Sequence, residues 1–244
     1  LVLPCPPNEN EKASYIITGR RFLMTWGVIA MCSVSAGMWL YVLSSEYLYW
    51  FGAPAAFLTL YLFLSYYGIA VWGKECNLRE HRETVVKAED EGCFPSVDVF
   101  LPCCGEPLSL MANTYKYVQA LDWPNLKVHV LDDGANEEIR YLADLHGFNY
   151  IRRDNRPAMR KAGNLRWAFA HTSGDLFVVF DADFCPRSDF LRETVPYFRE
   201  EKVAIVQTPQ FFRYRSEQSW VERGAGVTQE LFYRVIQVRV LEGG

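Results

Sequence analysis

Two long stretches without charge constrain the fold of this chain more than any other feature. Residues 22–43 and residues 50–73 contain no Asp, Glu, Lys or Arg, and each is long enough as a helix to cross a hydrocarbon core of about 30 Å. Aromatic residues stand near the ends of both stretches, as they do at membrane interfaces. A signal peptide has one shorter apolar region and a cleavage site, so two such stretches in tandem predict a transmembrane hairpin.

The flanking charges predict how this hairpin is oriented. Arg20 and Arg21 precede the first stretch and Lys74 and Arg79 follow the second, whereas the connecting loop contains only Glu46. Because cytoplasmic loops carry the excess of Lys and Arg, we expect both outer ends in the cytosol. The chain is then a multi-pass membrane protein whose residues from about 74 onward are cytosolic.

Net charge and cysteine spacing exclude two classes of ligand. The 244 residues carry a net charge of −4, which provides no basic stripe and predicts no nucleic-acid partner. The seven cysteines lack the paired spacing of a zinc site, and in a reducing cytosol we expect them to be free thiols.

Beyond a charged linker at residues 74–95, apolar runs alternate with stretches of helical periodicity. This alternation predicts βαβ units and a mainly parallel sheet of the α/β class. The expected strands are residues 97–101, 126–131, 150–151, 176–180 and 203–206, and the expected helices are residues 108–121, 137–146, 162–171, 189–200 and 217–241. For the helix at 189–200, Asp189 is the expected N-cap.

Acidic residues follow several of these strands. Asp181 and Asp183 follow the strand at 176–180, Asp132 and Asp133 follow that at 126–131, and Glu106 follows that at 97–101. Ligands of open α/β sheets bind at the carboxyl ends of the strands, where Mg²⁺ or Mn²⁺ accepts carboxylates together with diphosphate oxygens. A polar turn explains any one of these sites, but like charges gathered at one edge need compensation, which favours a metal–nucleotide site.

A basic loop at residues 152–161 precedes one of the expected helices. We interpret Lys161 as a phosphate contact, with Gly163 allowing the backbone to approach and the helix start near Asn164 adding its dipole. The alternative is a solvated charged loop, which the residues of the loop alone favour; its position ahead of the acidic strand favours phosphate.

At this point five motifs carry a resemblance to a known family. Over residues 97–238 the chain resembles family 2 glycosyltransferases of the cellulose synthase type. The motifs are Pro102-Cys103-Cys104-Gly105-Glu106-Pro107, Leu131-Asp132-Asp133-Gly134, Lys161-Ala162-Gly163-Asn164-Leu165, Phe180-Asp181-Ala182-Asp183 and Val206-Gln207-Thr208-Pro209-Gln210-Phe211-Phe212. The resemblance implies a GT-A domain, Rossmann-like and nucleotide-sugar-binding, that follows a transmembrane hairpin. It also implies an inverting enzyme that polymerises sugar from a UDP-sugar, with UDP-glucose as the expected donor, and passes the chain through its own membrane channel.

The resemblance also implies roles for single residues. Asp132 or Asp133 would hold the uridine beside Glu106, Lys161 would face the diphosphate, and the stretch at 208–210 would line the sugar and acceptor region. Asp181 and Asp183 would bind Mg²⁺ or Mn²⁺, with Asp183 as the direct ligand. The predicted catalytic residues are Asp133, Asp181 and Asp183, and the predicted substrate-binding residues are Glu106, Asp132, Asp133, Lys161, Gly163, Asn164, Thr208, Pro209 and Gln210.

The chain departs from the family pattern at several points. The Thr-Glu-Asp segment that holds the family's general base and the later Gln-x-x-Arg-Trp segment do not occur in it, and its first residue is Leu. We therefore expect a fragment or a truncated gene product that binds donor without processive synthesis. Cys103 and Cys104 also replace the Thr/Ser–Tyr pair usual before the Glu, and cysteine is the poorer hydrogen-bonding residue.

These expectations leave open which sugar is used and whether the chain is active. Alternatives are a chitin- or hyaluronan-synthase-like enzyme that uses UDP-N-acetylglucosamine, and a catalytically inactive membrane protein that binds nucleotide or assembles with a full-length relative. The expected parts are an N-terminal cytosolic segment (1–21), the hairpin (22–73), the linker (74–95) and an incomplete GT-A domain (96–244). The expected partners are a UDP-sugar, a growing β-linked polysaccharide, the lipid bilayer of the plasma membrane, and a second copy of the chain.

Overall fold

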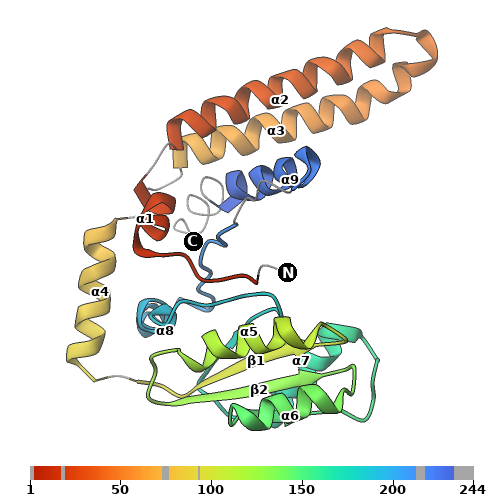
Figure 1. Ribbon diagram of the computed structural model, residues 1–244. Helices are drawn as coiled ribbons and strands as arrows, with labels where there is room; N and C mark the ends of the chain where they lie inside the picture. The colour runs from red at the N-terminus through yellow and green to blue at the C-terminus, as the bar shows by residue number, and fades with distance from the viewer. Residues whose placement is uncertain (1–2, 18–19, 73–76, 93, 213–217, 234–244) are drawn as a thin grey trace. The chain divides into compact units, whose positions relative to one another are not determined.

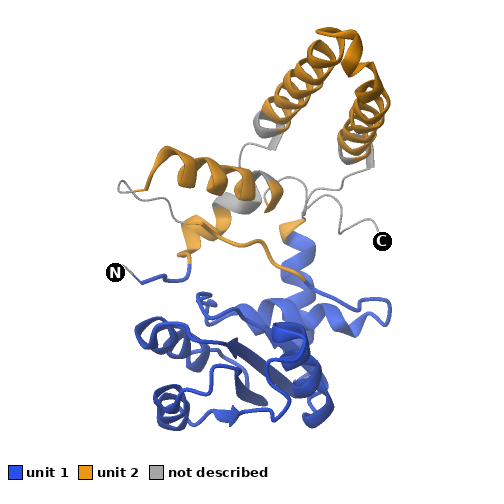
Figure 2. Ribbon diagram, turned by 90° about the vertical axis from the view of Figure 1, so that its right-hand side faces the viewer, with its two compact units in different colours: residues 1–6, 79–206 blue, residues 7–78, 207–244 orange. Residues whose placement is uncertain are grey.

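A computed structural model describes residues 3–17, 20–72, 77–92, 94–212 and 218–233. The chain forms two compact units, which Figure 2 distinguishes by colour. The first comprises residues 1–6 and 79–206, and the second comprises residues 7–78 and 207–244. The units are defined by contacts within the chain, so they do not test the predicted domain boundaries, which stay predictions.

The first unit is built on a four-stranded parallel sheet with the order β3-β2-β1-β4 (Figure 1). Val99 of β1 lies opposite Val128 of β2 and Val178 of β4. The chain runs outward from β1 to β3 and then returns across β1 to form β4, so the direction of winding reverses between β1 and β4. In open α/β sheets ligands bind beside such a reversal, at the carboxyl ends of the strands. The strands are β1 (Val97–Cys103), β2 (Leu126–Asp132), β3 (Asn149–Ile151) and β4 (Leu176–Val179).

Helices cover both faces of this sheet, which explains why β1 is buried along its whole length. Alternate residues of β1 point to opposite faces, so Val99 and Leu101 join one cluster and Phe100 joins another. The first cluster includes Met111 of α5 and Ile139 of α6, and the second includes residues of α7. The helices are α5 (Leu108–Gln119), α6 (Glu137–Leu145), α7 (Arg160–His171) and α8 (Phe190–Thr194), which continues into the 3₁₀ helix η2 (Val195–Arg199).

The charged linker forms helix α4 (Leu78–Asp90), which is tied to α8 and η2. His81 stacks on Tyr197, with its Nδ1 2.7 Å from the phenol oxygen. The guanidinium of Arg192 lies 3.3 Å from the Glu89 carboxylate and also pairs with Asp122. These exposed pairs each contribute little, but together they fix the linker helix on the unit that follows it.

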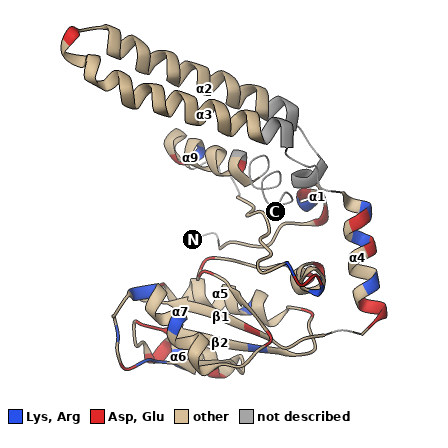
Figure 3. Ribbon diagram, turned by 180° about the vertical axis from the view of Figure 1, so that it is seen from behind, with Lys and Arg blue, Asp and Glu red and all other residues tan. Residues whose placement is uncertain are grey.

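The second unit contains the two apolar helices. Residues 24–43 and 46–68 are long and apolar enough to cross a membrane, and only 11% and 6% of these spans are buried. A core helix of a soluble protein would be mostly buried, and these two spans are not. Figure 3 shows residues 24–43 and 52–68 of these helices without charge, and Glu46 lies in the connection. The elements are α1 (Glu9–Ile17), α2 (Arg20–Leu43), the 3₁₀ helix η1 (Glu46–Phe51), α3 (Gly52–Trp72) and α9 (Trp220–Leu231).

The predicted fold class is confirmed, because the strands at the first four predicted positions form one parallel sheet and two helices are long enough to span a bilayer. The predicted strand at residues 203–206 is wrong. These residues form no strand and pair with no neighbour in the described part of the chain, and Ile205 is 83% exposed.

Two predicted helices are shorter than expected. The one at 189–200 ends as an α-helix at Thr194 and tightens into η2, because Pro196 has no N–H to continue the ladder. Asp189 does not cap it, since its carboxylate pairs with Arg187 at 2.9 Å. Of the helix predicted at 217–241, α9 covers residues 220–231, where Ser219 and Glu222 form a capping box. Residues 217 and 234–241 lie outside the described residues.

Replacing Leu101 with Ala should destabilise the first unit by about 2–5 kcal/mol, because the side chain is 0% exposed and its removal leaves a cavity in the central strand. The matched control is Leu145→Ala on α6, where the side chain is 64% exposed and we expect a change within about 0.5 kcal/mol. Urea unfolding followed by near-UV circular dichroism measures both. Equal losses from the two substitutions would contradict the described core.

Candidate active site

The turns that follow β1 and β2 pack directly against each other. The Asp133 N–H donates to the Cys103 carbonyl at 3.0 Å, and a Cβ added to Gly134 would lie 3.0 Å from the Gly105 nitrogen. The Glu106 carboxylate accepts from the Cys104 N–H at 2.5 Å. Glu106 is therefore held at the strand end, beside the turn that carries the acids of β2.

The two cysteines of the first turn face different surroundings. Cys103 is buried, and burial together with the nearby Asp132 carboxylate raises the pKa of its thiol well above the ordinary range. Cys104 is exposed, so only this thiol is available to a ligand at the strand ends. The five cysteines in the described part of the chain are all free.

Asp132 supports the structure of the turn between β2 and α6. Its side chain accepts from the Gly134 N–H at 2.8 Å, the Asn136 N–H at 2.7 Å and the Tyr150 hydroxyl at 2.8 Å, and the residue is only 1% exposed. Burial and this hydrogen bond raise the pKa of the Tyr150 phenol. Since both oxygens of Asp132 have donors within the chain, its predicted contact with uridine stays a prediction.

Asp133 forms a buried ion pair with Arg153. The guanidinium Nε and Nη2 donate to the two carboxylate oxygens at 2.8 and 2.6 Å, and the two side chains are 0% (Arg153) and 5% (Asp133) exposed. These hydrogen bonds raise the pKa of the Arg153 guanidinium. The basic loop had two interpretations, phosphate contact and solvated charge, and Arg153 fits neither. The predicted catalytic role of Asp133 stays a prediction.

Lys161 and Asp181 are brought together from different elements. Lys161 is the second residue of α7, Asp181 follows β4, and their side chains form an ion pair in which each is about half exposed. Asp183 is exposed and has no hydrogen-bond or ion-pair partner among the described residues. Of the predicted acids, Asp183 is thus the carboxylate most open to a ligand.

Gly163 and Asn164 hold α7 against its surroundings. A Cβ on Gly163 would lie 2.1 Å from the Ala158 carbonyl oxygen and 2.6 Å from the Arg153 Nη1, so the close approach that requires glycine is made by the protein itself. The Asn164 amide donates to the Leu131 carbonyl at 2.8 Å, and its buried Oδ1 has no partner in the structure. Whether either residue also contacts a substrate stays a prediction.

The crowding of carboxylates is compensated within the chain. We expected acids at one edge to need a cation, but backbone N–H groups and Tyr150 satisfy Asp132, Arg153 pairs with Asp133, and Lys161 pairs with Asp181. No group of three or more His, Cys, Asp or Glu side chains suited to a metal occurs in the described part of the chain. Asp181 and Asp183 would therefore need other oxygen donors to complete a metal site.

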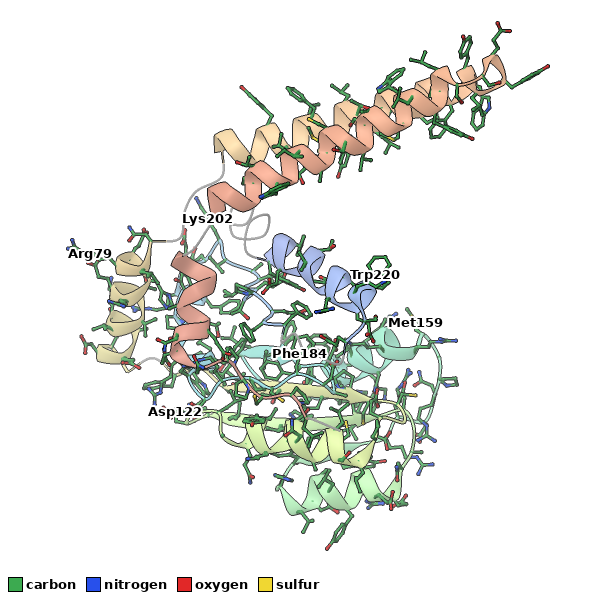
Figure 4. All side chains as sticks on the ribbon, turned by 45° about the horizontal axis from the view of Figure 1, so that its top comes forward. Arg79, Asp122, Met159, Phe184, Lys202 and Trp220 are labelled. Atoms are coloured by element: carbon green, nitrogen blue, oxygen red, sulfur yellow. The ribbon has the colours of Figure 1, made fainter. Side chains whose placement is uncertain are left out.

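Sequence reasoning missed a second set of contacts that fixes the turn around Asp183. Thr114 of α5 donates to the Ala182 carbonyl at 2.6 Å. Asn113 donates to the Pro4 carbonyl at 2.7 Å and to the Cys185 Sγ at 3.2 Å. Phe184, labelled in Figure 4, packs against the core cluster of α5 and α6. No local sequence motif predicts these contacts, because they join residues that are about 70 to 110 positions apart.

The remaining predicted residues, Thr208, Pro209 and Gln210, belong to the second unit. Their predicted place beside the sugar and acceptor stays a prediction.

The profile of glycosyl transferase family 2 matches residues 98–243, which include both strand-end turns and the Asp-x-Asp turn. The chain belongs to this family. It is 45% identical over 130 residues to a cellulose synthase catalytic subunit [UDP-forming] of Pseudomonas fluorescens, covering 52% of this chain and 17% of that protein. It is 36% identical over 164 residues to cellulose synthase 1 of Komagataeibacter xylinus, covering 64% of this chain and 10% of that protein. The chain thus spans less than a fifth of the length of these relatives.

Among solved structures the likeness is partial. A mannosyltransferase from Pyrobaculum calidifontis in complex with GDP-Man and Mn²⁺ is 22% identical, with 53% of this chain and 45% of that chain covered and a TM-score of 0.42. Glucosyl-3-phosphoglycerate synthase from Mycobacterium tuberculosis, in complex with Mn²⁺, UDP and glucosyl-3-phosphoglycerate, is 22% identical, with 44% of this chain and 40% of that chain covered and a TM-score of 0.36.

Replacing Gly163 with Ala should destabilise the first unit by about 1–3 kcal/mol, because the added methyl group overlaps the Ala158 carbonyl. The matched control is Gly224→Ala in α9, where a Cβ would meet nothing within 4 Å and the helix should be unchanged or slightly more stable. Thermal unfolding measures both. A neutral Gly163→Ala would contradict the described packing.

Cys185 should resist alkylation far more than Cys104. Burial raises the pKa of the Cys185 thiol to about 11, so the reactive thiolate is about 0.1% of the population at pH 8. Mass spectrometry after iodoacetamide treatment should find Cys104 modified before Cys185, with modification of Cys185 accelerating as pH rises toward 11. Equal rates at pH 8 would show that Cys185 is not protected as described.

Proposed function

We propose that this chain provides the donor-binding part of a membrane-bound, inverting, processive glycosyltransferase of the cellulose synthase type. It would take a hexosyl unit from UDP-glucose for a growing β-linked polysaccharide. The observation that carries the proposal is the pairing of Lys161 with Asp181 beside the exposed Asp183, at the strand ends where the sheet reverses. Family membership and the UDP-forming cellulose synthases among the relatives support it.

The donor set fits a hard divalent cation. Asp181 and Asp183 supply two carboxylates at one turn, and Mg²⁺ is commonly held by one or two carboxylates plus substrate phosphates. That the described residues include no larger cluster of metal ligands agrees with a metal held mainly by the diphosphate. Mg²⁺ or Mn²⁺ bound there would neutralise charge that develops on the departing UDP.

The Lys161 ammonium would also neutralise negative charge on the diphosphate. In the described state it neutralises Asp181, and a bound diphosphate would give it a stronger partner. Lys161 lies in the first turn of α7, where the helix dipole favours an anion. Glu106, placed by the Cys104 N–H, and the turn that Asp132 organises would form the uridine side of the pocket.

Transfer with inversion also needs a general base that takes the proton of the acceptor hydroxyl. The Thr-Glu-Asp and Gln-x-x-Arg-Trp segments associated with that step do not occur in these 244 residues. Donor binding is therefore the step for which this chain supplies groups. The two apolar helices support a membrane location with the site on the cytosolic side, and export of polymer suits the plasma membrane.

The test is calorimetric titration of the whole chain in detergent micelles with UDP, with and without Mn²⁺. Wild-type protein should bind UDP more tightly with Mn²⁺ than without it. Asp183→Asn should weaken UDP binding in the presence of Mn²⁺ at least tenfold, because the carboxylate charge is lost. UDP-glucose and UDP-N-acetylglucosamine compared in the same way test the choice of sugar.

The matched control is Asp144→Asn. Asp144 is exposed near the end of α6, which runs back toward the opposite edge of the sheet, so this change should leave UDP binding as it is. No binding of UDP by folded wild-type protein, with or without Mn²⁺, would overturn the proposal.

A further inference from the structure

Arg153 is the largest of the fully buried side chains in the described part of the chain. Its side chain is 0% exposed, and a buried cation is tolerated only when its donors are satisfied. Two donors bind the carboxylate of Asp133 at 2.8 and 2.6 Å. The others bind backbone carbonyls, those of Ala158 at 2.7 Å and Arg160 at 3.1 Å, with a weaker contact to Asn155 at 3.4 Å.

These two carbonyls lie on either side of Met159, the N-cap residue that directly precedes α7. Met159, labelled in Figure 4, has φ 55°, and Arg160 has φ 46°. Side chains other than glycine rarely adopt this left-handed conformation, so the segment needs outside contacts to hold it. Arg153 supplies them, because one planar group fixes the chain immediately before and after the bend.

The residue that follows this bend is Lys161. Because Lys161 is the second residue of α7, the start and direction of this helix set where its ammonium meets Asp181. Gly163 closes the arrangement from the other side, since a Cβ there would lie 2.6 Å from Arg153 Nη1. A continuous path of contacts therefore leads from Asp133 at the end of β2, through Arg153 and the start of α7, to Asp181 at the end of β4.

We propose that Arg153 is a positioning residue for donor binding: it touches no ligand, and with Asp133 as its counterion it sets the start of α7 so that Lys161 meets the diphosphate. This inference rests on the proposed function. It assigns the Asp133 carboxylate to Arg153 and not to the uridine.

The chemistry explains why arginine is required. A lysine ammonium at 153 keeps the charge but cannot donate in one plane to two carboxylate oxygens and two carbonyls. Arg153→Lys should therefore weaken binding of UDP about tenfold or more, as loss of an orienting contact commonly does. Uridine, which lacks the phosphates, should bind as it does to the wild type.

The experiment measures UDP binding in the presence of Mn²⁺ by calorimetry, and uridine binding by saturation-transfer NMR. It uses the whole chain, the Arg153→Lys variant, and both combined with Lys161→Met. If Arg153 acts through Lys161, Arg153→Lys should have no further effect on UDP affinity once Lys161 is Met. If Arg153→Lys instead destabilised the whole unit, it would weaken UDP binding equally with Lys161 and with Met at that position. That result would overturn the inference.

Two further variants complete the design. Arg166→Lys, at an exposed arginine on the same helix, is the matched control and should leave UDP affinity unchanged. If Arg153→Lys does not fold, Asp133→Asn tests the same contact, because the amide keeps the volume but loses the charge. The Asp133→Asn variant should bind UDP more weakly and uridine as tightly as the wild type does. Loss of uridine binding would assign Asp133 to the nucleoside and contradict the inference.

The outcome also separates this inference from the proposed function. If the wild-type protein binds no UDP in the presence of Mn²⁺, the proposed function is wrong. If the wild-type protein binds UDP and the Arg153→Lys variant binds it equally tightly, only the role assigned to Arg153 is wrong.

Discussion

Strand β1 is the element on which the first unit depends. It pairs with β2 on one side and with β4 on the other, and both of its faces are covered by helices. Burying a central strand in this way removes a continuous run of apolar side chains from water, which is the largest favourable term in folding. Because β1 lies where the winding reverses, the same burial fixes the two neighbouring strand ends at which Glu106 and Asp181 emerge.

At these strand ends the chain handles its charge by pairing acids with its own donors. Asp132 receives N–H groups and a phenol, Asp133 receives a guanidinium, and Asp181 receives an ammonium. Burial separates the roles of these pairs. The enclosed pair between Asp133 and Arg153 cannot be exchanged without a large cost, whereas the half-exposed pair between Lys161 and Asp181 can open when a competing anion or cation arrives.

The sequence was sufficient to predict the parallel sheet, the uncharged hairpin and the residues that gather at the strand ends, because periodicity, charge and turn chemistry are local properties. It was insufficient where a long-range partner decides the outcome. Residues 203–206 have the composition of a strand, yet no neighbouring strand pairs with them in the described structure. Arg153 has the same local appearance as its basic neighbours in the loop, and only the distant Asp133 marks it as buried. Asp189 lies at the N-cap position of its helix, but its carboxylate forms an ion pair with Arg187.

The placement of the first residues has a consequence for dissecting the molecule. Residues 1–6 belong to the first unit although residues 7–78 do not, so the polypeptide passes between the units near residues 6, 78 and 206. A domain excised as one continuous piece after the hairpin would lack the Pro4 carbonyl. The Asn113 amide and the Cys185 thiol would then turn to solvent beside the Asp183 turn. A truncated soluble domain would therefore differ from the intact protein in the surroundings of the carboxylate that a metal would need, although every residue of the site would still be present.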